Sequence, residues 1–144
     1  MSRMFVLFVL CAAALPVLAQ APTAPATAPA QATVPAATMG SIDQQALLDR
    51  IAARDQSLLI LDVRTAEEYA QGHVEGAVHI PYDQLPQRAA EIEAAKGKDV
   101  VLYCRSGRRS ELAAQTLHEK GFTRLLHLEG DILAWEAAQR PLVK

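Results

Sequence analysis

Between residues 40 and 144, short apolar runs alternate with amphipathic segments. Residues 58–61 and 100–103 are continuous apolar runs, which are typical of strands covered on both faces. Residues 76–80 and 125–128 indicate two further strands, and helical periodicity fills the segments between strands. Strands that alternate with helices in this way predict one α/β domain of three layers, in which helices flank a mainly parallel central sheet.

Capping signals and helical periodicity set the expected helix boundaries. Asp43 precedes one helical segment, and Thr65 followed by Glu68 forms a capping box that starts a short helix. We predict helices over residues 44–53, 65–72, 85–95, 110–120 and 132–140. Along the fourth of these, Leu112 and Leu117 are expected to face the core.

The first 42 residues carry a single charged side chain, that of Arg3. An apolar run follows it and ends in small residues around Ala19 and Ala21, which is the layout of a secretory signal. The run is shorter than the roughly 20 residues that span a bilayer, and Pro16 would interrupt its helix. We predict a signal peptide over residues 1–19, cleaved after Ala19 or Ala21, and export to a bacterial periplasm.

The segment between this signal and the folded domain is predicted to be a linker. Residues 20–39 consist mostly of Ala, Pro and Thr, and such a composition cannot bury enough surface to offset its ordering entropy. The domain therefore covers residues 40–144. Removal of the signal takes Cys11 with it, so Cys104 becomes the single remaining thiol. A lone cysteine in an exported protein indicates intermolecular pairing or a reactive thiol.

Composition argues against several classes of protein. A formal net charge of −2 gives no support for nucleic-acid binding, which favours basic domains. Two distant cysteines cannot build a disulfide scaffold, and the four histidines lack the spacing of metal ligands, so no metal is expected. We expect a monomer that has no stable membrane span once the signal is cleaved.

Chemistry is expected where the third strand ends, because ligands of open parallel sheets bind at the carboxyl ends of strands. Cys104 leaves that strand and opens the loop 104–109, with a helix predicted to begin near Ser110. Gly107 gives the loop freedom to curl, so that the N–H groups of residues 105–110 form an anion cradle. These N–H groups and the helix dipole favour the thiolate, which is the nucleophilic form of cysteine.

Three arginines, Arg105, Arg108 and Arg109, crowd the same loop. Each exposed cation near a helix N-terminus is disfavoured by about 0.3–1 kcal/mol, so helix stability does not explain them. Binding of an anionic substrate beside the thiolate does explain them. The alternative interpretation is a buried structural thiol with arginines that pair with surface acids.

The loop sequence Cys-Arg-Ser-Gly-Arg-Arg-Ser resembles the active-site loop of the rhodanese family, C-x-x-G-x-R-S. Three other segments agree with that family, and together the matches span about residues 41–140. They are Leu-Asp-Val-Arg at 61–64 with Glu68 and Tyr69, the segment 72–81, and Leu-Glu-Gly at 128–130 with Ala134 and Trp135. The resemblance implies a sulfurtransferase that takes a sulfane sulfur from thiosulfate, releases sulfite, and passes the sulfur to cyanide or a thiol. It implies no cofactor beyond a covalent cysteine persulfide.

Carried onto this chain, the resemblance makes Cys104 the nucleophile and persulfide carrier. The implied cradle and substrate-binding residues are Arg105, Ser106, Gly107, Arg108, Arg109 and Ser110. Asp62 and Arg64 match a family pair beside the loop, for which we expect a supporting role. Asp131 stands where the family usually has a second glycine. Aspartate tolerates turn conformations, so we expect the fold to persist, and the geometry of the loop near Asp131 stays open.

Other readings of the loop remain. Related phosphatases and arsenate reductases use C-x5-R, but here Ser110 occupies the arginine position and Arg109 follows after only four residues. The shorter loop suits a persulfide better than a phosphate. A persulfide carrier or interaction module that serves one protein partner is the other alternative. His73 and His79 belong to the family motif, where a structural hydrogen bond is the expected role.

Overall fold

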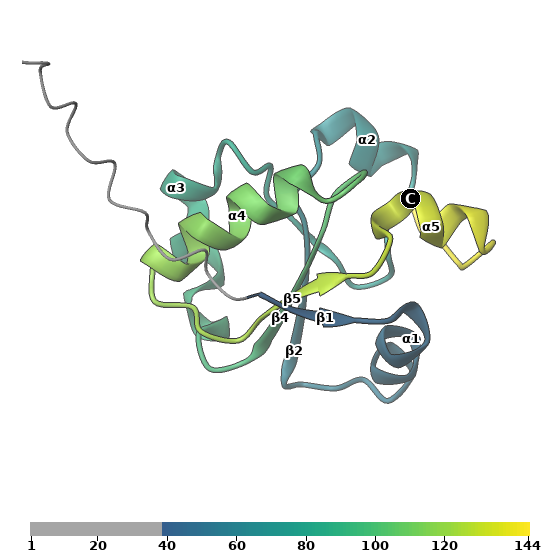
Figure 1. The fold of residues 1–144 in the computed structure, drawn as a ribbon, viewed down its shortest axis with the longest axis horizontal. Helices are drawn as coiled ribbons and strands as arrows, with labels where there is room; N and C mark the ends of the chain where they lie inside the picture. The colour runs from purple at the N-terminus through teal and green to yellow at the C-terminus, as the bar shows by residue number, and fades with distance from the viewer. Residues whose placement is uncertain (1–38) are drawn as a thin grey trace, which may run out of the picture. The chain divides into compact units, whose positions relative to one another are not determined.

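The computed structural model describes residues 39–144. The predicted signal peptide, and all but the last residue of the predicted linker, lie outside the described residues. The elements are β1 (Gly40–Ile42), α1 (Gln44–Ala52), β2 (Leu58–Asp62), α2 (Ala66–Gln71), β3 (Val78–His79), α3 (Leu85–Arg88), the 3₁₀ helix η1 (Ala89–Ala95), β4 (Asp99–Tyr103), α4 (Arg108–Glu119), β5 (Leu125–Leu128) and α5 (Asp131–Ala137) (Figure 1).

The strands form one parallel sheet in the order β1-β5-β4-β2-β3, which confirms the predicted α/β fold. Strands β2 and β4 pair in register, with Asp62 opposite Tyr103. The residues that follow these two strands therefore emerge side by side at one edge of the sheet. Strand β1 was not predicted; its three residues lie along β5, with Gly40 opposite Leu126.

Helices cover both faces of the sheet because side chains alternate along each strand. On β4, Val100 and Leu102 join the core under α3, η1 and α4, whereas Val101 and Tyr103 join the core under α1 and α5. Figure 1 shows α3 and α4 on one side of the strands and α1 on the other. The fold therefore has the three predicted layers.

Three helices differ from their expected form, the last because α5 begins at Asp131 and ends at Ala137, three residues before the predicted end. Residues 85–95 divide into α3 and η1. The buried residues of η1 are Ala89, Ile92 and Ala95, spaced by three, and a 3₁₀ helix places that spacing on one face. Helix α4 begins at Arg108, two residues early, because Gly107 with φ of 102° makes the turn directly before it.

The prediction that Leu112 faces the core was wrong. It is 41% exposed, while Ala113, Ala114 and Leu117 fill the buried stripe of α4.

Across residues 39–144, no helix has the length and apolarity needed to cross a membrane.

Candidate active site

Cys104 follows β4 directly and lies at the base of its loop, 1% exposed. Its Sγ accepts a hydrogen bond from the backbone N–H of Gly107 at 3.1 Å. Gly107 is the residue before α4, so the sulfur lies close to the N-terminus of a twelve-residue helix. A donated N–H and the helix dipole both stabilise negative charge on this sulfur.

Arg109 is fixed by a carboxylate on another helix. Its Nη1 and Nη2 donate to the two carboxylate oxygens of Glu68, at 2.5 and 2.9 Å. These bonds are the main reason that the pKa of Arg109 is raised, and Cys104 adds a smaller contribution in the same direction. Glu68 in turn has its pKa lowered to about 2, chiefly by Arg109. Arg109 is thus a fixed cation within electrostatic reach of the thiol.

The outer part of the loop is open to solvent. Arg105, Ser106 and Arg108 are exposed, and within residues 39–144 neither of these two arginines forms an ion pair. Pairing with surface acids, the alternative explanation of the arginines, therefore applies to Arg109 alone. Two unpaired cations beside a buried thiol suit an incoming anion.

Asp62 and Arg64 form a buried ion pair at the end of β2. The Arg64 guanidinium donates to both Asp62 oxygens, at 2.6 to 3.1 Å, and to the carbonyl of Gly72 at 2.8 Å. It also lies 5.6 Å from the ring centroid of Tyr103, whose hydroxyl accepts from the N–H of Val74 at 3.1 Å. The pair thus braces the segment after α2 and the residue before Cys104, and none of these bonds reaches the sulfur.

Asp131 turns its side chain into the Cys104 loop. One carboxylate oxygen accepts from the N–H of Cys104 at 2.7 Å and from the hydroxyl of Ser110 at 3.4 Å. The other lies 2.9 Å from Nε2 of His127 on β5. Asp131 therefore joins β4, β5 and α4 at the site.

This site lies within a segment that matches a known protein family. The family model of the rhodanese-like domain matches residues 43–138. The chain belongs to the rhodanese-like domain family. A protein of Allochromatium vinosum named sulfurtransferase is 41% identical over 105 residues, which cover 73% of this chain and 95% of that protein.

Solved structures agree with this family. A rhodanese-related protein from Thermoplasma volcanium superimposes with a TM-score of 0.62 at 27% identity, covering 72% of this chain and 97% of that one. The Alr3790 protein of Anabaena sp. gives a TM-score of 0.65 at 29% identity, with 71% and 81% covered.

Sequence reasoning missed two members of the site in this rhodanese-family domain. Glu68 was recognised as part of a family-matching segment and as half of a capping box, which it does form with Thr65, but not as a partner of the Cys104 loop. Its second role depends on Arg109, which lies 41 residues away in the chain. His127 was considered only as one of the four histidines that lack metal-ligand spacing; its position four residues before Asp131 is the one local signal that could have indicated a pair.

The remaining histidines of the family motif have structural contacts. Tyr69 stacks between His73 and His79, at centroid distances of 3.6 and 4.5 Å. His73 Nδ1 lies 3.1 Å from the carbonyl of Tyr69, and His79 Nε2 lies 3.0 Å from that of Arg64. Among the residues that the structure describes, no group of three or more His, Cys, Asp or Glu side chains could hold a metal ion.

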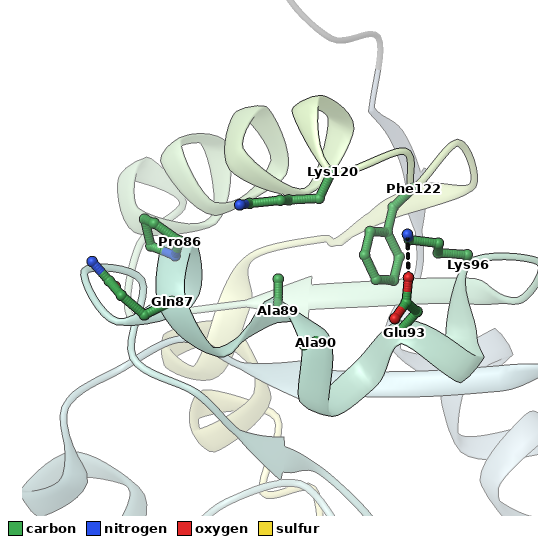
Figure 2. Close-up of a pocket in the computed structure, with 8 residues that line it drawn as sticks. All are labelled: Pro86, Gln87, Ala89, Ala90, Glu93, Lys96, Lys120 and Phe122. Atoms are coloured by element: carbon green, nitrogen blue, oxygen red, sulfur yellow. Dashed lines mark hydrogen bonds and ion pairs between the residues drawn. The ribbon is translucent and has the colours of Figure 1, made fainter.

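A separate hollow of about 180 Å³ lies between η1 and the end of α4 (Figure 2). Lys96 pairs with Glu93 at 2.7 Å across its rim, and its Nζ lies 6.0 Å from the ring centroid of Phe122. Its lining contains neither a cysteine nor any residue of the Cys104 loop. The hollow is therefore separate from the candidate site around Cys104.

Proposed function

We propose that this domain is a sulfurtransferase in which Cys104 carries a sulfane sulfur as a persulfide. The observation that carries the proposal is the Gly107 N–H, which donates to Sγ of Cys104 at the N-terminus of α4. Membership of the rhodanese-like family and the sulfurtransferase name of the A. vinosum relative support it. Export to the periplasm, with cleavage after Ala19 or Ala21, is part of the same proposal.

Thiosulfate is the donor that we propose. The Cys104 thiolate attacks its outer sulfur, an S–S bond forms at Sγ, the S–S bond of thiosulfate breaks, and sulfite leaves with the electron pair. Cyanide or a thiolate then attacks the outer sulfur of the persulfide, and Cys104 departs as the thiolate. Both steps are nucleophilic displacements that conserve charge, so they need no other cofactor.

The role that we propose for each site residue follows from its position around Cys104. Cys104 is the nucleophile, and the N–H groups of residues 105–110 hold the anionic sulfur. Arg105 and Arg108, both exposed, meet the donor, while Arg109 supplies fixed positive charge. Asp62 and Arg64 support the loop through the segment that they brace.

One mass measurement tests export and chemistry together. The full chain is expressed in a bacterial host, recovered from the periplasm, reduced, and weighed before and after incubation with thiosulfate. We expect a chain that begins at Gln20 or Pro22 and gains the mass of one sulfur, while Cys104→Ser gains nothing. Sulfate in place of thiosulfate is the matched control. Absence of the gain at neutral pH with reduced Cys104 would overturn the proposal.

The same sample distinguishes the alternatives. Loss of the added mass to cyanide or a small thiol supports an enzyme that turns over freely. A persulfide that resists both but passes to a protein thiol indicates a carrier for one partner. Hydrolysis of an aryl phosphate that depends on Cys104, without sulfur uptake, would replace sulfur transfer by phosphatase chemistry.

A further inference from the structure

Asp131 places an acidic side chain beside the reactive thiol. It starts α5 with φ of 53°, in the left-handed region that glycine enters at lower cost than aspartate. The residue is nevertheless 2% exposed, so its carboxylate is withdrawn from water. Contacts of this side chain must offset both costs.

Those contacts hold the peptide groups of Cys104. The Asp131 carboxylate accepts from the N–H of Cys104 at 2.7 Å, and the next residue, Ile132, donates its N–H to the carbonyl of Cys104 at 3.2 Å. Two consecutive residues of α5 therefore fix the backbone that carries Sγ. The same carboxylate accepts from the buried Ser110 hydroxyl in the first turn of α4.

His127 lies beside this carboxylate and supplies a matching cation when its ring is protonated. Its Nε2 lies 2.9 Å from Asp131 Oδ2, and this hydrogen bond is the main cause that raises the pKa of His127, against the opposing effect of burial. The negative charges of Glu111 on α4 and Glu129 after β5 raise the pKa of His127 further. Glu129 is itself held by the hydroxyl of Ser41 on β1, at 2.8 Å. All of the acids that act on the ring favour its protonated form.

The pair of His127 and Asp131 packs against the cradle itself. A Cβ placed on Gly107 would lie 3.4 Å from Asp131 Oδ2 and 3.5 Å from His127 Cε1. Gly107 is the residue whose N–H donates to Sγ of Cys104. Both members of the pair therefore lie against the residue whose N–H binds the sulfur.

We propose that Asp131 and protonated His127 are positioning residues that act as one unit on Cys104. Asp131 holds the Cys104 backbone in place, and His127 cancels the negative charge that this carboxylate would otherwise impose on the thiolate. The inference concerns the same thiol as the proposed function and rests on its being the reactive group. Loss of the His127 charge alone should slow Cys104, and loss of both charges should restore it.

The test is the rate at which Cys104 reacts with iodoacetamide at pH 6. The full chain also holds Cys11, so alkylation is followed by mass spectrometry of the peptide that contains Cys104. We expect His127→Gln to react about tenfold more slowly, since an uncompensated like charge disfavours a thiolate by roughly one pKa unit or more. The double variant His127→Gln/Asp131→Asn should return to within about threefold of wild type, as expected when the local charge is removed.

A purely structural role predicts the opposite order, because the double variant would lose more contacts than the single one. A double variant as slow as His127→Gln, or an unchanged His127→Gln, overturns the inference. His118→Gln, on the exposed side of α4, is the matched control and should keep the wild-type rate. If the double variant with asparagine fails to fold, His127→Gln/Asp131→Gly takes its place, because the backbone conformation at residue 131 favours glycine.

Alkylation needs no sulfur donor, so this test is separate from that of the proposed function. If the variants alkylate at the expected rates but wild type gains no mass from thiosulfate, the positioning unit is supported and the proposed donor chemistry is rejected. A mass gain together with equal alkylation rates in all variants would support sulfur transfer and reject the positioning unit.

Discussion

Removal of one partner from the buried pair of Asp62 and Arg64 should cost far more stability than removal of one partner from a surface ion pair. Asp62 is fully buried and Arg64 is 4% exposed. The change Arg64→Met keeps a long apolar side chain but removes every guanidinium bond to Asp62 and the bond to the Gly72 carbonyl. The Asp62 carboxylate then retains only the backbone N–H of residue 64, at 3.0 Å, as a donor among these contacts.

The magnitude follows from that uncompensated charge. Removal of one partner of a buried ion pair costs about 3–5 kcal/mol. The free energy of unfolding of a small domain is about 5–15 kcal/mol, so this single change removes a large share of it. At about 4 °C or more per kcal/mol for a domain of this size, the midpoint of thermal unfolding should fall by at least about 12 °C.

Urea and thermal unfolding followed by circular dichroism measure this loss. Arg50→Met is the matched control: Arg50 also bridges two aspartates, Asp55 and Asp99, but its side chain is 23% exposed, so its loss should cost much less. Asp62→Asn added to Arg64→Met should recover part of the stability, because it removes the stranded charge. A loss below about 1 kcal/mol for Arg64→Met, smaller than a single buried hydrogen bond with its desolvation penalty, would refute the reasoning.

Two further variants test the acid that holds Arg109 and the glycine that shapes the loop. Because Arg109 lowers the pKa of Glu68 from 4.5 to about 2, this carboxylate stabilises the fold above pH 4.5 and the contribution disappears as the pH falls toward 2. Urea titrations should therefore show wild type losing more stability than Glu68→Gln over that interval; parallel losses would contradict the assignment. Gly107→Ala should cost about 1–2 kcal/mol, because φ is 102° there, and should reduce sulfur uptake. Gly97→Ala, with no atom within 4 Å of the new methyl group, is its control, and equal unfolding midpoints for the two variants would show that the loop is not strained.

The fold was predictable where the signal was local. Residues 58–61 and 100–103 are apolar without interruption, and the Thr65 capping box formed as expected. Strand β1 was not predictable, because the three residues Gly-Ser-Ile have no pattern of their own. Their extended conformation depends on pairing with β5, more than eighty residues later in the chain.

The candidate site was likewise predictable only where its residues are close together in the sequence. The loop that begins at Cys104 is contiguous, so its strand, glycine and arginines were visible together. Glu68 and Asp131 reach this loop from 41 and 27 residues away, to Arg109 and Cys104 respectively. A departure from the family pattern marked Asp131 as unusual, but only the packing of α5 against the loop shows which groups its carboxylate contacts.

The charges of the site can be matched one by one. Glu68 is paired with Arg109 and Asp131 with His127, so each of these two acids has its own cation when His127 is protonated. Arg105 and Arg108 are left, exposed and without an ion pair among residues 39–144. In the sulfur transfer proposed above, two surplus positive charges suit the dianion thiosulfate, but they also suit the product sulfite, which is an anion of similar charge. Charge can therefore draw the donor to the loop but cannot distinguish it from its product. In the proposed transfer, that distinction comes from the one atom that sulfite lacks, the outer sulfur that would be attacked by the Cys104 thiolate held by the Gly107 N–H.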